Sequence, residues 1–435
     1  FSHIYIYLYQ FLYNSSFSTQ SSMKNSFLSE MTSRGFLNQC TNLDKLNEFS
    51  SQKSIAAYIG FDCTASSLHV GSLMQIMTLR LLQRYGHQPI ILLGGGTTLI
   101  GDPSGKDSTR KILKQKDIKK NILSIKKTFE KLLTSKSKKT KPVFVDNYNW
   151  LGKLKYIDFL RDVGKHFTIN KMLTFDSVKL RLDREQSLSY MEFNYMILQA
   201  YDFYQLFKKN NCILQMGGSD QWGNIVSGTD LVRRILQKEV FGLTTPLITL
   251  ASGAKMGKTE KGAVWLNKKM FSPYDYWQFW RNTADGDVKK FLYYFTELSV
   301  DEISNKTENE KDINKLKILL ANEATSILHG SKAAKESAQT AKDTFIKGGL
   351  GKSIPEKRMS KKIILQGINI IEFAFRNGLV ESKSEARRIL KNNGIKLNDT
   401  VIPDDNRIIE MNDVKKDNYI KLSLGKKNHL KIKII

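Results

Sequence analysis

Residues 55–72 read IAAYIGFDCTASSLHVGS, and this stretch decides the fold class. Its first part, IAAYIGF (55–61), is an apolar run of strand length. Residues 72–86, SLMQIMTLRLLQRYG, then carry apolar side chains at helical spacing and end on Gly86. PIILLGGG (89–96) is a second apolar strand that enters a glycine-rich turn. This alternation predicts a parallel, doubly wound α/β sheet that binds ligands beyond the carboxyl ends of its strands.

The 435-residue chain is long enough for two or three domains. Residues 1–33 are expected to be a disordered spurious start or leader, since residues 1–22 hold no charged side chain. Residues 104–141 hold 14 Lys and Arg against three acids, which predicts a mobile loop followed by an exposed helix. We expect a Rossmann-like catalytic domain, an α-helical domain, a linker and a small α+β domain at residues 34–270, 271–350, 351–366 and 367–435.

Composition narrows the partners and the compartment. The chain has 68 Lys and Arg against 42 Asp and Glu, a net charge of +26, which favours a polyanionic partner such as nucleic acid. The alternative is an AT-rich genome that fills protein surfaces with Lys, Asn and Ile. No uncharged apolar run approaches the roughly 18 residues of a membrane-spanning helix. Cys40, Cys63 and Cys212 form no C-x-x-C pair, which argues against a disulfide scaffold or zinc site and suggests a reducing compartment.

Two motifs suit a polyphosphate. CTASSLHVGS (63–72) gathers small polar side chains between the expected strand and helix, where backbone N–H groups are unpaired and the helix dipole is positive. There His69 would donate to a phosphate oxygen, and Gly71 would let a flat base approach. KMGKT (255–259) places two lysines three residues apart, suited to charge that builds on a leaving pyrophosphate. A simple helix cap and an exposed basic turn are the alternatives.

A third motif suits a small polar ligand. Tyr195, Gln199 and Asp202 are spaced i, i+4 and i+7, so they share one face of a helix whose other residues are strongly apolar. Buried polar groups need partners. These three residues therefore face either a polar ligand or an internal hydrogen-bond network.

Two glycine-flanked turns complete the set. GGSDQWGN (217–224) places an acid and an amide where they would hold a ribose hydroxyl and a polar substrate group. IGDPSGK (100–106) puts Asp102 at the carboxyl edge of the sheet, beside Lys106 and Arg110. Asp102 would bind an ammonium group while the loop cations close over phosphates. An ordinary turn is the alternative for both.

The order and spacing of these motifs resemble bacterial-type tyrosyl-tRNA synthetase, a class I aminoacyl-tRNA synthetase, from about Arg34 to the C-terminus. HVGS (69–72) matches the class signature usually written HIGH, and KMGKT the one usually written KMSKS. YIGFDCTASSLHVGS, GDPSGK, NYMILQAYDF and GGSDQWGN are family segments in the expected order. Ser72 stands where the signature has a second histidine, which leaves the role of Ser72 open.

The resemblance implies a role for each site residue. For tyrosine, Tyr58 and Asp202 would bind the phenol hydroxyl, Asp102, Tyr195 and Gln199 the α-ammonium, and Gln221 the carboxylate. The implied ATP-binding residues are Asp62, Thr64, His69, Gly71, Asp220 and Lys258. The implied catalytic residues are His69, Ser72, Lys255, Lys258, Thr259, Lys106 and Arg110.

The implied reaction is tyrosine–tRNA ligation. The carboxylate of L-tyrosine would attack the α-phosphate of ATP, supplied with Mg²⁺, to give tyrosyl-adenylate and pyrophosphate. Tyrosine would then pass to the 3′-terminal ribose of tRNA(Tyr). No protein nucleophile, protein-bound metal or prosthetic group is implied, so catalysis would be positioning and electrostatics. Phenylalanine would be rejected because it leaves Tyr58 and Asp202 buried and unpaired.

The C-terminal residues predict RNA binding. Ser382 and Glu385 form a capping box that opens a helix. The implied RNA-binding residues are Lys383, Arg387, Arg388 and Lys391, three of which recur every four residues on one helix face. The segment resembles the S4-type RNA-binding module of these synthetases. A solvated basic helix is the alternative.

Two rival functions remain open at this stage. The tryptophan enzyme shares the fold, but Asp202 with Tyr58 suits a phenol hydroxyl. A non-catalytic RNA-binding protein built on a synthetase is the other, and the joint presence of His69, Lys255 and Lys258 argues against it. The resemblance also implies a homodimer without membrane association in the bacterial cytoplasm, with the mitochondrial matrix as the alternative.

Overall fold

The computed structural model describes residues 26–103, 113–250, 256, 258–259, 262–347, 354–415, 417–425 and 428–435. For residues 258–259 and 344–347 it describes the backbone only. The chain forms two compact units. The first comprises the residues up to Met256 and the segment Tyr293–Ile303, and the second comprises Gly257–Leu292 and Ser304–Ile435.

The first unit is built on a six-stranded sheet with the order β1-β6-β5-β2-β3-β4. β1 runs antiparallel to β6, and all other neighbours are parallel. The strands are β1 (Gln39–Cys40), β2 (Ala56–Asp62), β3 (Gln88–Gly94), β4 (Val143–Asp146), β5 (Cys212–Gly218) and β6 (Phe241–Thr245). β2 lies between β3 and β5, so the chain order reverses there and the crevice beyond the ends of β2 and β5 is the expected ligand site.

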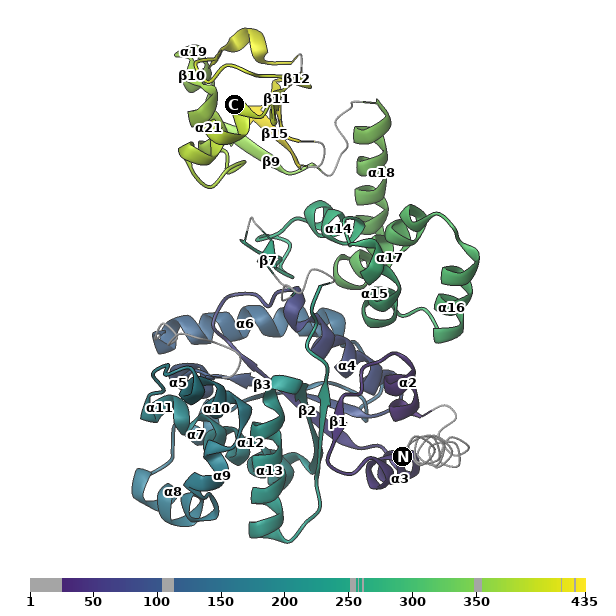
Figure 1. The fold of residues 1–435 in the computed structure, drawn as a ribbon, viewed down its shortest axis with the longest axis vertical. Helices are drawn as coiled ribbons and strands as arrows, with labels where there is room; N and C mark the ends of the chain where they lie inside the picture. The colour runs from purple at the N-terminus through teal and green to yellow at the C-terminus, as the bar shows by residue number, and fades with distance from the viewer. Residues whose placement is uncertain are drawn as a thin grey trace, which may run out of the picture. The chain divides into compact units, whose positions relative to one another are not determined.

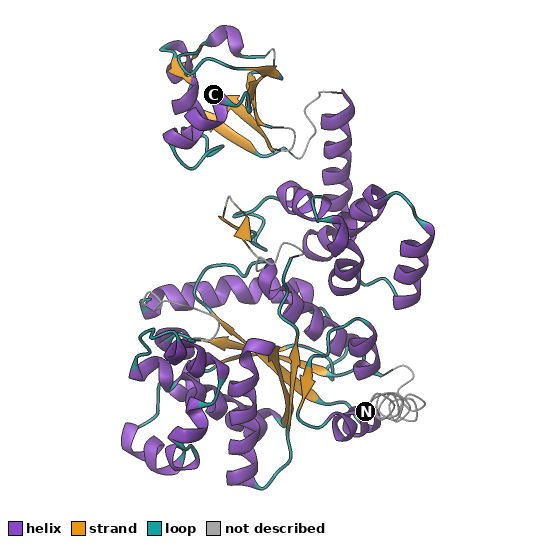
Figure 2. Ribbon diagram, in the orientation of Figure 1, coloured by secondary structure: helices purple, strands orange, loops and turns teal. Residues whose placement is uncertain are grey.

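Helices cover both faces of this sheet (Figures 1 and 2). The helices are α2 (Phe27–Ser33), α3 (Leu43–Gln52), α4 (Leu73–Arg84), α5 (Thr97–Ile100), α6 (Gln115–Leu132), α7 (Tyr148–Leu151), α8 (Tyr156–Asp162), α9 (Ile169–Leu173), α10 (Asp176–Asp183), α11 (Tyr190–Phe193), α12 (Tyr195–Asn210) and α13 (Trp222–Leu236). Short 3₁₀ turns are η2 (Val70–Ser72), η3 (Gly164–His166) and η4 (Ser219–Gln221).

The alternation of β2 side chains explains the two cores. Tyr58 lies on one face of the sheet, with its ring 5.4 Å from that of Phe203 in α12. Phe61, an odd number of residues further on, lies on the other face, 4.8 Å from Phe129 of α6. The predicted doubly wound α/β sheet is therefore confirmed.

The N-terminal boundary was predicted wrongly. Residues 26–33 were expected to lie outside the fold, yet Phe27, Leu28 and Met31 of α2 are buried. Ser26 caps the helix by accepting from the N–H of Ser29. The helical spacing of apolar residues in α2 extends over only one short helix, and it directly follows an uncharged stretch that was taken to lie outside the fold. Residues 1–25 lie outside the described residues.

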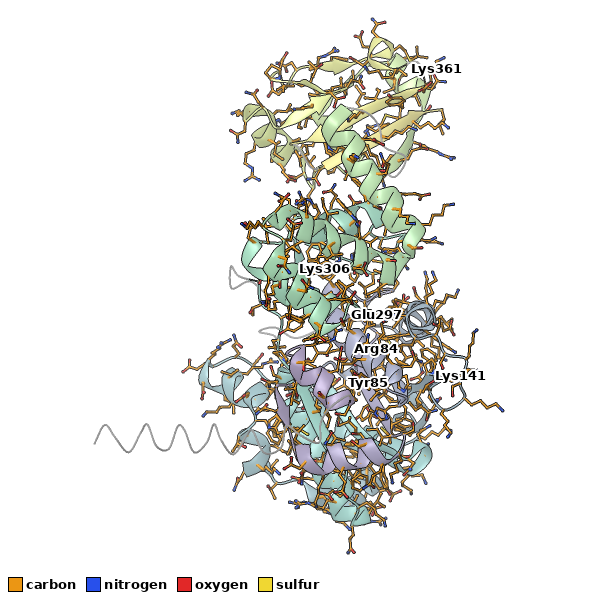
Figure 3. All side chains as sticks on the ribbon, turned by 90° about the vertical axis from the view of Figure 1, so that its right-hand side faces the viewer. Arg84, Tyr85, Lys141, Glu297, Lys306 and Lys361 are labelled. Carbon is orange, nitrogen blue, oxygen red and sulfur yellow. The ribbon has the colours of Figure 1, made fainter. Side chains whose placement is uncertain are left out.

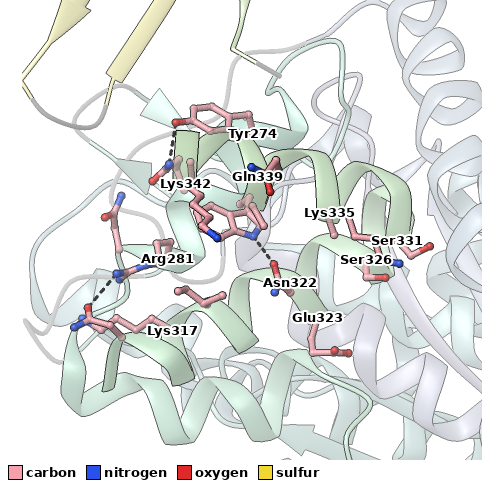
Figure 4. A pocket seen from close by; sticks show the side chains of 18 of the residues that line it. Tyr274, Arg281, Lys317, Asn322, Glu323, Ser326, Ser331, Lys335, Gln339 and Lys342 are labelled. Carbon is pink, nitrogen blue, oxygen red and sulfur yellow. Dashed lines mark hydrogen bonds between the residues drawn. The ribbon is translucent and has the colours of Figure 1, made fainter. Parts of the chain in front are cut away.

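The helical part of the second unit matches the prediction only in part. Its helices are α14 (Pro273–Arg281), α15 (Val288–Phe295), α16 (Val300–Asn309), α17 (Ile313–His329) and α18 (Ser331–Lys347), with η5 at Asp285–Asp287. The single domain expected at 271–350 is interrupted, because Tyr293–Ile303 belongs to the first unit. Side chains of α14, α17 and α18 line a pocket, where the Trp277 indole donates to Asn322 at 2.8 Å (Figure 4).

The C-terminal part holds a five-stranded sheet with the order β12-β11-β14-β15-β9. Its elements are β9 (Glu356–Met359), α19 (Lys361–Leu365), β10 (Ile368–Asn369), α20 (Ile370–Arg376), α21 (Lys383–Lys391), β11 (Ile395–Leu397), β12 (Thr400–Val401), β13 (Ile408–Ile409), η6 (Met411–Asp413), β14 (Tyr419–Leu424) and β15 (Asn428–Ile434). The linker predicted at 351–366 is wrong from Glu356 onward, since β9 pairs in parallel with β15. A charged strand at the edge of a sheet lacks the apolar pattern that would identify it.

Within the described residues, none of the helices combines the length and apolar character needed to cross a membrane.

Candidate active site

The polar side chains of the sequence motifs converge at the crevice beyond β2 and β5. η2 follows β2, η4 follows β5, and α12 packs against β5. The parallel strands end at one edge of the sheet, so residues about 160 positions apart in the chain become neighbours. These elements all belong to the first unit.

Asp202 of α12 is the centre of the buried half of the site. Its carboxylate is 1% exposed and accepts from the Asn147 amide at 2.9 Å and from the Trp150 indole at 2.7 Å. Tyr58 of β2 is fully buried nearby, and its hydroxyl has no hydrogen-bond partner among the described residues. An unpaired buried hydroxyl costs about 1–3 kcal/mol. The pair therefore suits a ligand that brings a hydroxyl group.

Burial sets the charge state of this pair. Burial raises the pKa of Asp202 to about 7, opposed by the two donors and aided by the charges of Asp62 and Asp146. Burial first, and then the nearby charge of Asp202, raise the pKa of Tyr58 well above its ordinary value. Near neutral pH, Tyr58 is thus a neutral phenol, and Asp202 is poised to accept a further donor.

A second set of contacts links Tyr195 to the same network. The Tyr195 hydroxyl donates to both carboxylate oxygens of Asp62 at 3.3 Å. Asp62 also accepts from Thr97 at 2.9 Å, and Thr97 accepts from the Asn147 amide at 3.1 Å. Asn147 therefore bridges Asp62 and Asp202, so these carboxylates are held by one continuous chain of hydrogen bonds.

A third set joins Asp102 and Gln199, which are expected at the α-ammonium, to Gln221, which is expected at the carboxylate. The Gln221 amide donates to Asp102 at 2.9 Å. The Asn224 amide donates to both Gln199 and Gln221 at 3.1 Å. Asp102, Gln199 and Gln221, which come from three separate motifs, are thereby brought together.

His69 and Gly71 form a local unit at the start of η2. The His69 Nδ1 accepts from the Gly71 N–H at 3.0 Å, which leaves Nε2 to carry the proton of the neutral ring. A Cβ at position 71 would lie 2.6 Å from the imidazole Cε1 and 3.1 Å from the Met256 carbonyl. Gly71 is therefore required by the imidazole itself, a reason that the sequence alone does not reveal.

If His69 contacts ATP as the sequence resemblance implies, Gly71→Ala is expected to displace the His69 ring and to slow ATP-dependent chemistry at least about 10-fold, a loss of roughly 1.4 kcal/mol of transition-state stabilisation. Binding of the amino acid should change little, because Gly71 lies outside the Asp202 network. Gly286→Ala is the matched control, since a Cβ there meets nothing within 4 Å. Pre-steady-state rates that are equal in both variants would contradict this account of Gly71.

Some of the remaining predicted site residues are exposed, and others lie outside the part of the chain that the structure describes. Thr64 and Asp220 are exposed, and Ser72 precedes α4 without making a side-chain cap bond. Lys106, Arg110 and Lys255 lie outside the described residues. Lys258–Thr259 form β7, which pairs with β8 (Gly262–Ala263) in the second unit, and only their backbone is described.

Sequence reasoning missed several residues that shape the site. Asn147 and Trp150 follow β4 in the stretch VFVDNYNW, so the carboxyl-edge rule that identified Asp102 would also have found them. Gln215 of β5 is buried, its side-chain amide oxygen has no hydrogen-bond partner within the described part of the chain, and no sequence motif marks it. Among the described residues, no three His, Cys, Asp or Glu side chains are grouped so as to hold a metal ion.

The geometry agrees with comparisons to known proteins. Residues 50–346 match the family described as tRNA synthetases class I (W and Y), and residues 346–432 match the SYY-like C-terminal domain of tyrosine–tRNA ligase. A tyrosine–tRNA ligase of Pelagibacter ubique is 61% identical over 94% of this chain and all of its own length. The chain belongs to the tyrosine–tRNA ligase family.

Further relatives agree with this assignment. A tyrosine–tRNA ligase of Rickettsia africae is 51% identical over 94% of this chain and all of its own length. The crystal structure of a C-terminally truncated mitochondrial tyrosyl-tRNA synthetase of Aspergillus nidulans is 29% identical, with a TM-score of 0.67, over 75% of this chain and 96% of its own. The curated relatives are bacterial, as the sequence resemblance implied.

Proposed function

We propose that this chain activates L-tyrosine with ATP and transfers it to tRNA(Tyr), and that Tyr58 and Asp202 select the substrate by its phenol hydroxyl. The observation that supports this best is the buried Tyr58 hydroxyl, which has no partner beside a carboxylate with a pKa of about 7. A tyrosine hydroxyl would donate to Asp202 and accept from Tyr58. Tryptophan and phenylalanine offer no such hydroxyl.

The α-ammonium and carboxylate of tyrosine would lie at a group of polar residues separate from the Tyr58–Asp202 pair. Asp102, Tyr195 and Gln199 would hold the α-ammonium, and the Gln221 amide would approach the carboxylate. Support comes from the contacts that already join these side chains, since Asn224 connects Gln199 to Gln221. Because these side chains are already positioned before tyrosine binds, they lower the barrier to attack on the α-phosphate.

ATP would occupy the crevice beside η2 and η4. The Nε2 proton of His69 would donate to phosphate, and Asp62, Thr64, Gly71 and Asp220 would contact the nucleotide, with Ser72 nearby. Lys255, Lys258, Thr259, Lys106 and Arg110 would stabilise the departing pyrophosphate. Mg²⁺ would enter with the ATP phosphates rather than in a protein cage, as Mg²⁺ commonly does.

Pyrophosphate exchange tests this proposal. The chain is incubated with ATP, labelled pyrophosphate and tyrosine, tryptophan or phenylalanine in turn. Exchange driven by tyrosine alone supports both the reaction and the phenol site. Exchange driven by tryptophan rejects the pocket assignment, and folded protein without exchange rejects the ligase function.

Tyr58→Phe is expected to weaken tyrosine binding about 10-fold, because one hydrogen bond worth roughly 1.4 kcal/mol is lost. The free energy of unfolding of the tyrosine-free protein should stay equal or rise by up to about 1 kcal/mol, because an unpaired hydroxyl is removed. Tyr85→Phe is the control, since the Tyr85 hydroxyl donates to Glu30 at 3.2 Å. It should lose stability and keep its tyrosine affinity.

The chain is further proposed to act as a homodimer. Of the 17 exposed large hydrophobic side chains described, eight lie between Tyr156 and Tyr190. The hydroxyls of these two tyrosines are 3.1 Å apart, and both residues line a largely apolar pocket of about 470 Å³. Clustered apolar exposure of this kind marks a protein interface.

Tyr190→Asp is expected to raise the dimer dissociation constant by about 10²–10³-fold, because a carboxylate replaces an aromatic ring that is 66% exposed in the single chain. Sedimentation equilibrium would measure the change. Leu365→Asp, at a residue 65% exposed in the second unit, is the control. A wild-type chain that stays monomeric at micromolar concentration would reject the dimer.

The C-terminal part is proposed to bind tRNA through α21. Ser382 caps this helix by accepting from the Glu385 N–H at 3.1 Å, but the Glu385 carboxylate accepts from the Glu381 N–H at 2.7 Å, so only one bond of the expected capping box is present. Arg387, Arg388 and Lys391 would contact phosphates, while Lys383 forms an ion pair with Glu372 at 2.6 Å. The proposed location is the bacterial cytoplasm, which the bacterial relatives support.

A further inference from the structure

The exposed face of α6 carries a concentration of charge that the reaction does not use. Residues 114–141 hold 11 lysines and two acids, a net charge of +9 out of +26 for the whole chain. Lys116, Lys120, Lys127 and Lys131 are all exposed, and their spacing of four, seven and four residues places them along one stripe of α6. We name these four residues the α6 lysine stripe.

The opposite face of α6 fixes the helix to the fold. Ile118, Ile125, Phe129 and Leu132 are buried, so the stripe points away from the sheet. The turn after the helix is also held, because the Gln83 amide donates to the Thr140 carbonyl at 2.7 Å. Lys141 projects from this turn at the surface of the unit (Figure 3). The cations are thus presented by a rigid element.

The stripe starts at the rim of the active site. The Asn121 amide donates to the carbonyl of Cys63 at 2.9 Å, in the segment that leads to His69. Burial raises the pKa of Asp146, which borders the Asp202 network, and the charge of nearby Lys119 opposes that rise. The whole stripe, from Lys116 to Lys131, runs about 22 Å along the helix at 1.5 Å per residue.

We propose that the α6 lysine stripe binds the phosphate backbone of the tRNA whose 3′ end enters the active site. This inference rests on the proposed function, which requires a polyanion to approach that rim. None of the four lysines forms an ion pair with another described residue, so their charges are available to RNA phosphates, and cations condensed on the RNA would be released when they bind. Leu123, 63% exposed within the basic face, adds one apolar contact.

An anionic membrane is the competing partner for a basic helix, but the structure disfavours it. A helix that lies in a membrane interface needs its apolar face free to enter the acyl region. The apolar face of α6 packs in the core instead, with Phe129 against Phe61 at 4.8 Å. A single exposed leucine leaves little to insert.

The test compares two variants with equal loss of charge. One changes Lys116, Lys120, Lys127 and Lys131 to Gln together, and the other changes Lys45, Lys53, Lys179 and Lys238, which are exposed elsewhere on the first unit. Binding of tRNA(Tyr) is measured between 50 and 200 mM salt. The stripe variant should bind about 10–100-fold more weakly at about 100 mM salt, and its slope of log Kd against log salt should fall by about 2–3. The control slope should change by less than about 1.

A second measurement on the unchanged chain guards against misfolding of the variant. Bound tRNA should protect the stripe lysines, but not Lys53 and Lys238, from acetylation by an amine-reactive ester, read by mass spectrometry. Equal reactivity with and without tRNA, or equal salt slopes in both variants, would overturn the proposal. So would a stripe variant that keeps tRNA affinity and loses binding to phosphatidylserine vesicles. Pyrophosphate exchange by the wild-type chain needs no tRNA, so it tests the proposed function separately from the α6 lysine stripe.

Discussion

Asp202→Asn is expected to lower kcat/KM for tyrosine in pyrophosphate exchange by about 10²–10³-fold. The carboxylate accepts from Asn147 and Trp150, so an amide at position 202 turns an N–H group toward one of these donors. The proposed bond to the substrate phenol is lost as well. Removing one partner of a buried charged hydrogen bond costs roughly 3–5 kcal/mol. The expected 10²–10³-fold decrease in kcat/KM corresponds to about 3–4 kcal/mol, within that cost.

The same carboxylate predicts a pH dependence. The pKa of Asp202 is about 7 without tyrosine, and a phenol that donates to the carboxylate favours its ionised form. Tyrosine affinity should therefore rise as the pH is raised through 7 and level off above about pH 8. Asp202→Asn should lack this rise. Isothermal titration from pH 5.5 to 8.5 would measure both chains.

Stability should move in the opposite direction. The folded chain holds a proton on Asp202 between about pH 4 and 7 that the unfolded chain releases, because the pKa rises from 3.8 to about 7 on folding. The stabilising contribution of that proton is present at low pH and is lost as the pH rises through 7. The unfolding free energy of wild type relative to Asp202→Asn should fall across this window.

The control for both measurements is Asp44→Asn, the same change at an exposed residue of α3. It should leave exchange and both pH profiles unchanged. If Asp202→Asn keeps exchange within about tenfold of wild type, the phenol-binding role of Asp202 is rejected.

Arg34→Ala is expected to lower the unfolding free energy of the first unit by about 3 kcal/mol. The Arg34 guanidinium, 4% exposed, donates to the backbone carbonyls of Tyr293 and Thr296 at 2.9 and 3.2 Å, to that of Leu298, and to Glu30 at 2.6 Å. Alanine would leave these buried acceptors unpaired, at about 1–3 kcal/mol each before relaxation. The segment Tyr293–Ile303 should therefore loosen.

Hydrogen exchange at the amides of Tyr293–Ile303 is the direct measurement, because it reports this segment without assuming that the whole chain unfolds in one step. Arg84→Ala is a matched control. Arg84 pairs with the same Glu30 at 2.9 Å, but its side chain is 41% exposed, so its loss should cost under about 1 kcal/mol. Arg84, Tyr85 and Glu297 are labelled on the first unit in Figure 3. Equal protection in both variants would refute the role given to Arg34.

The corrections to the domain boundaries share one physical cause. Arg34 reads as one more surface cation in a chain with 68 basic residues, yet it joins α2 to carbonyls about 260 positions away. Likewise, the β9 sequence EKRM has the polarity of a linker, and only its pairing with β15 makes it a strand. Hydrogen bonds to the backbone of a distant segment produce no periodic pattern in the sequence of either segment.

The sequence by itself determined the parallel α/β sheet and the family, and it supplied the proposed tyrosine-side residues. These follow from local patterns, namely apolar runs at strand and helix spacing and short motifs at strand ends, which depend on near neighbours alone. Only the tertiary structure decided that Asn147 and Trp150 hold Asp202, that Asp62 contacts Tyr195, and that Gly71 is required by the His69 ring. Those facts depend on burial and on donors from distant strands, which set the pKa of Asp202 and leave the Tyr58 hydroxyl unpaired.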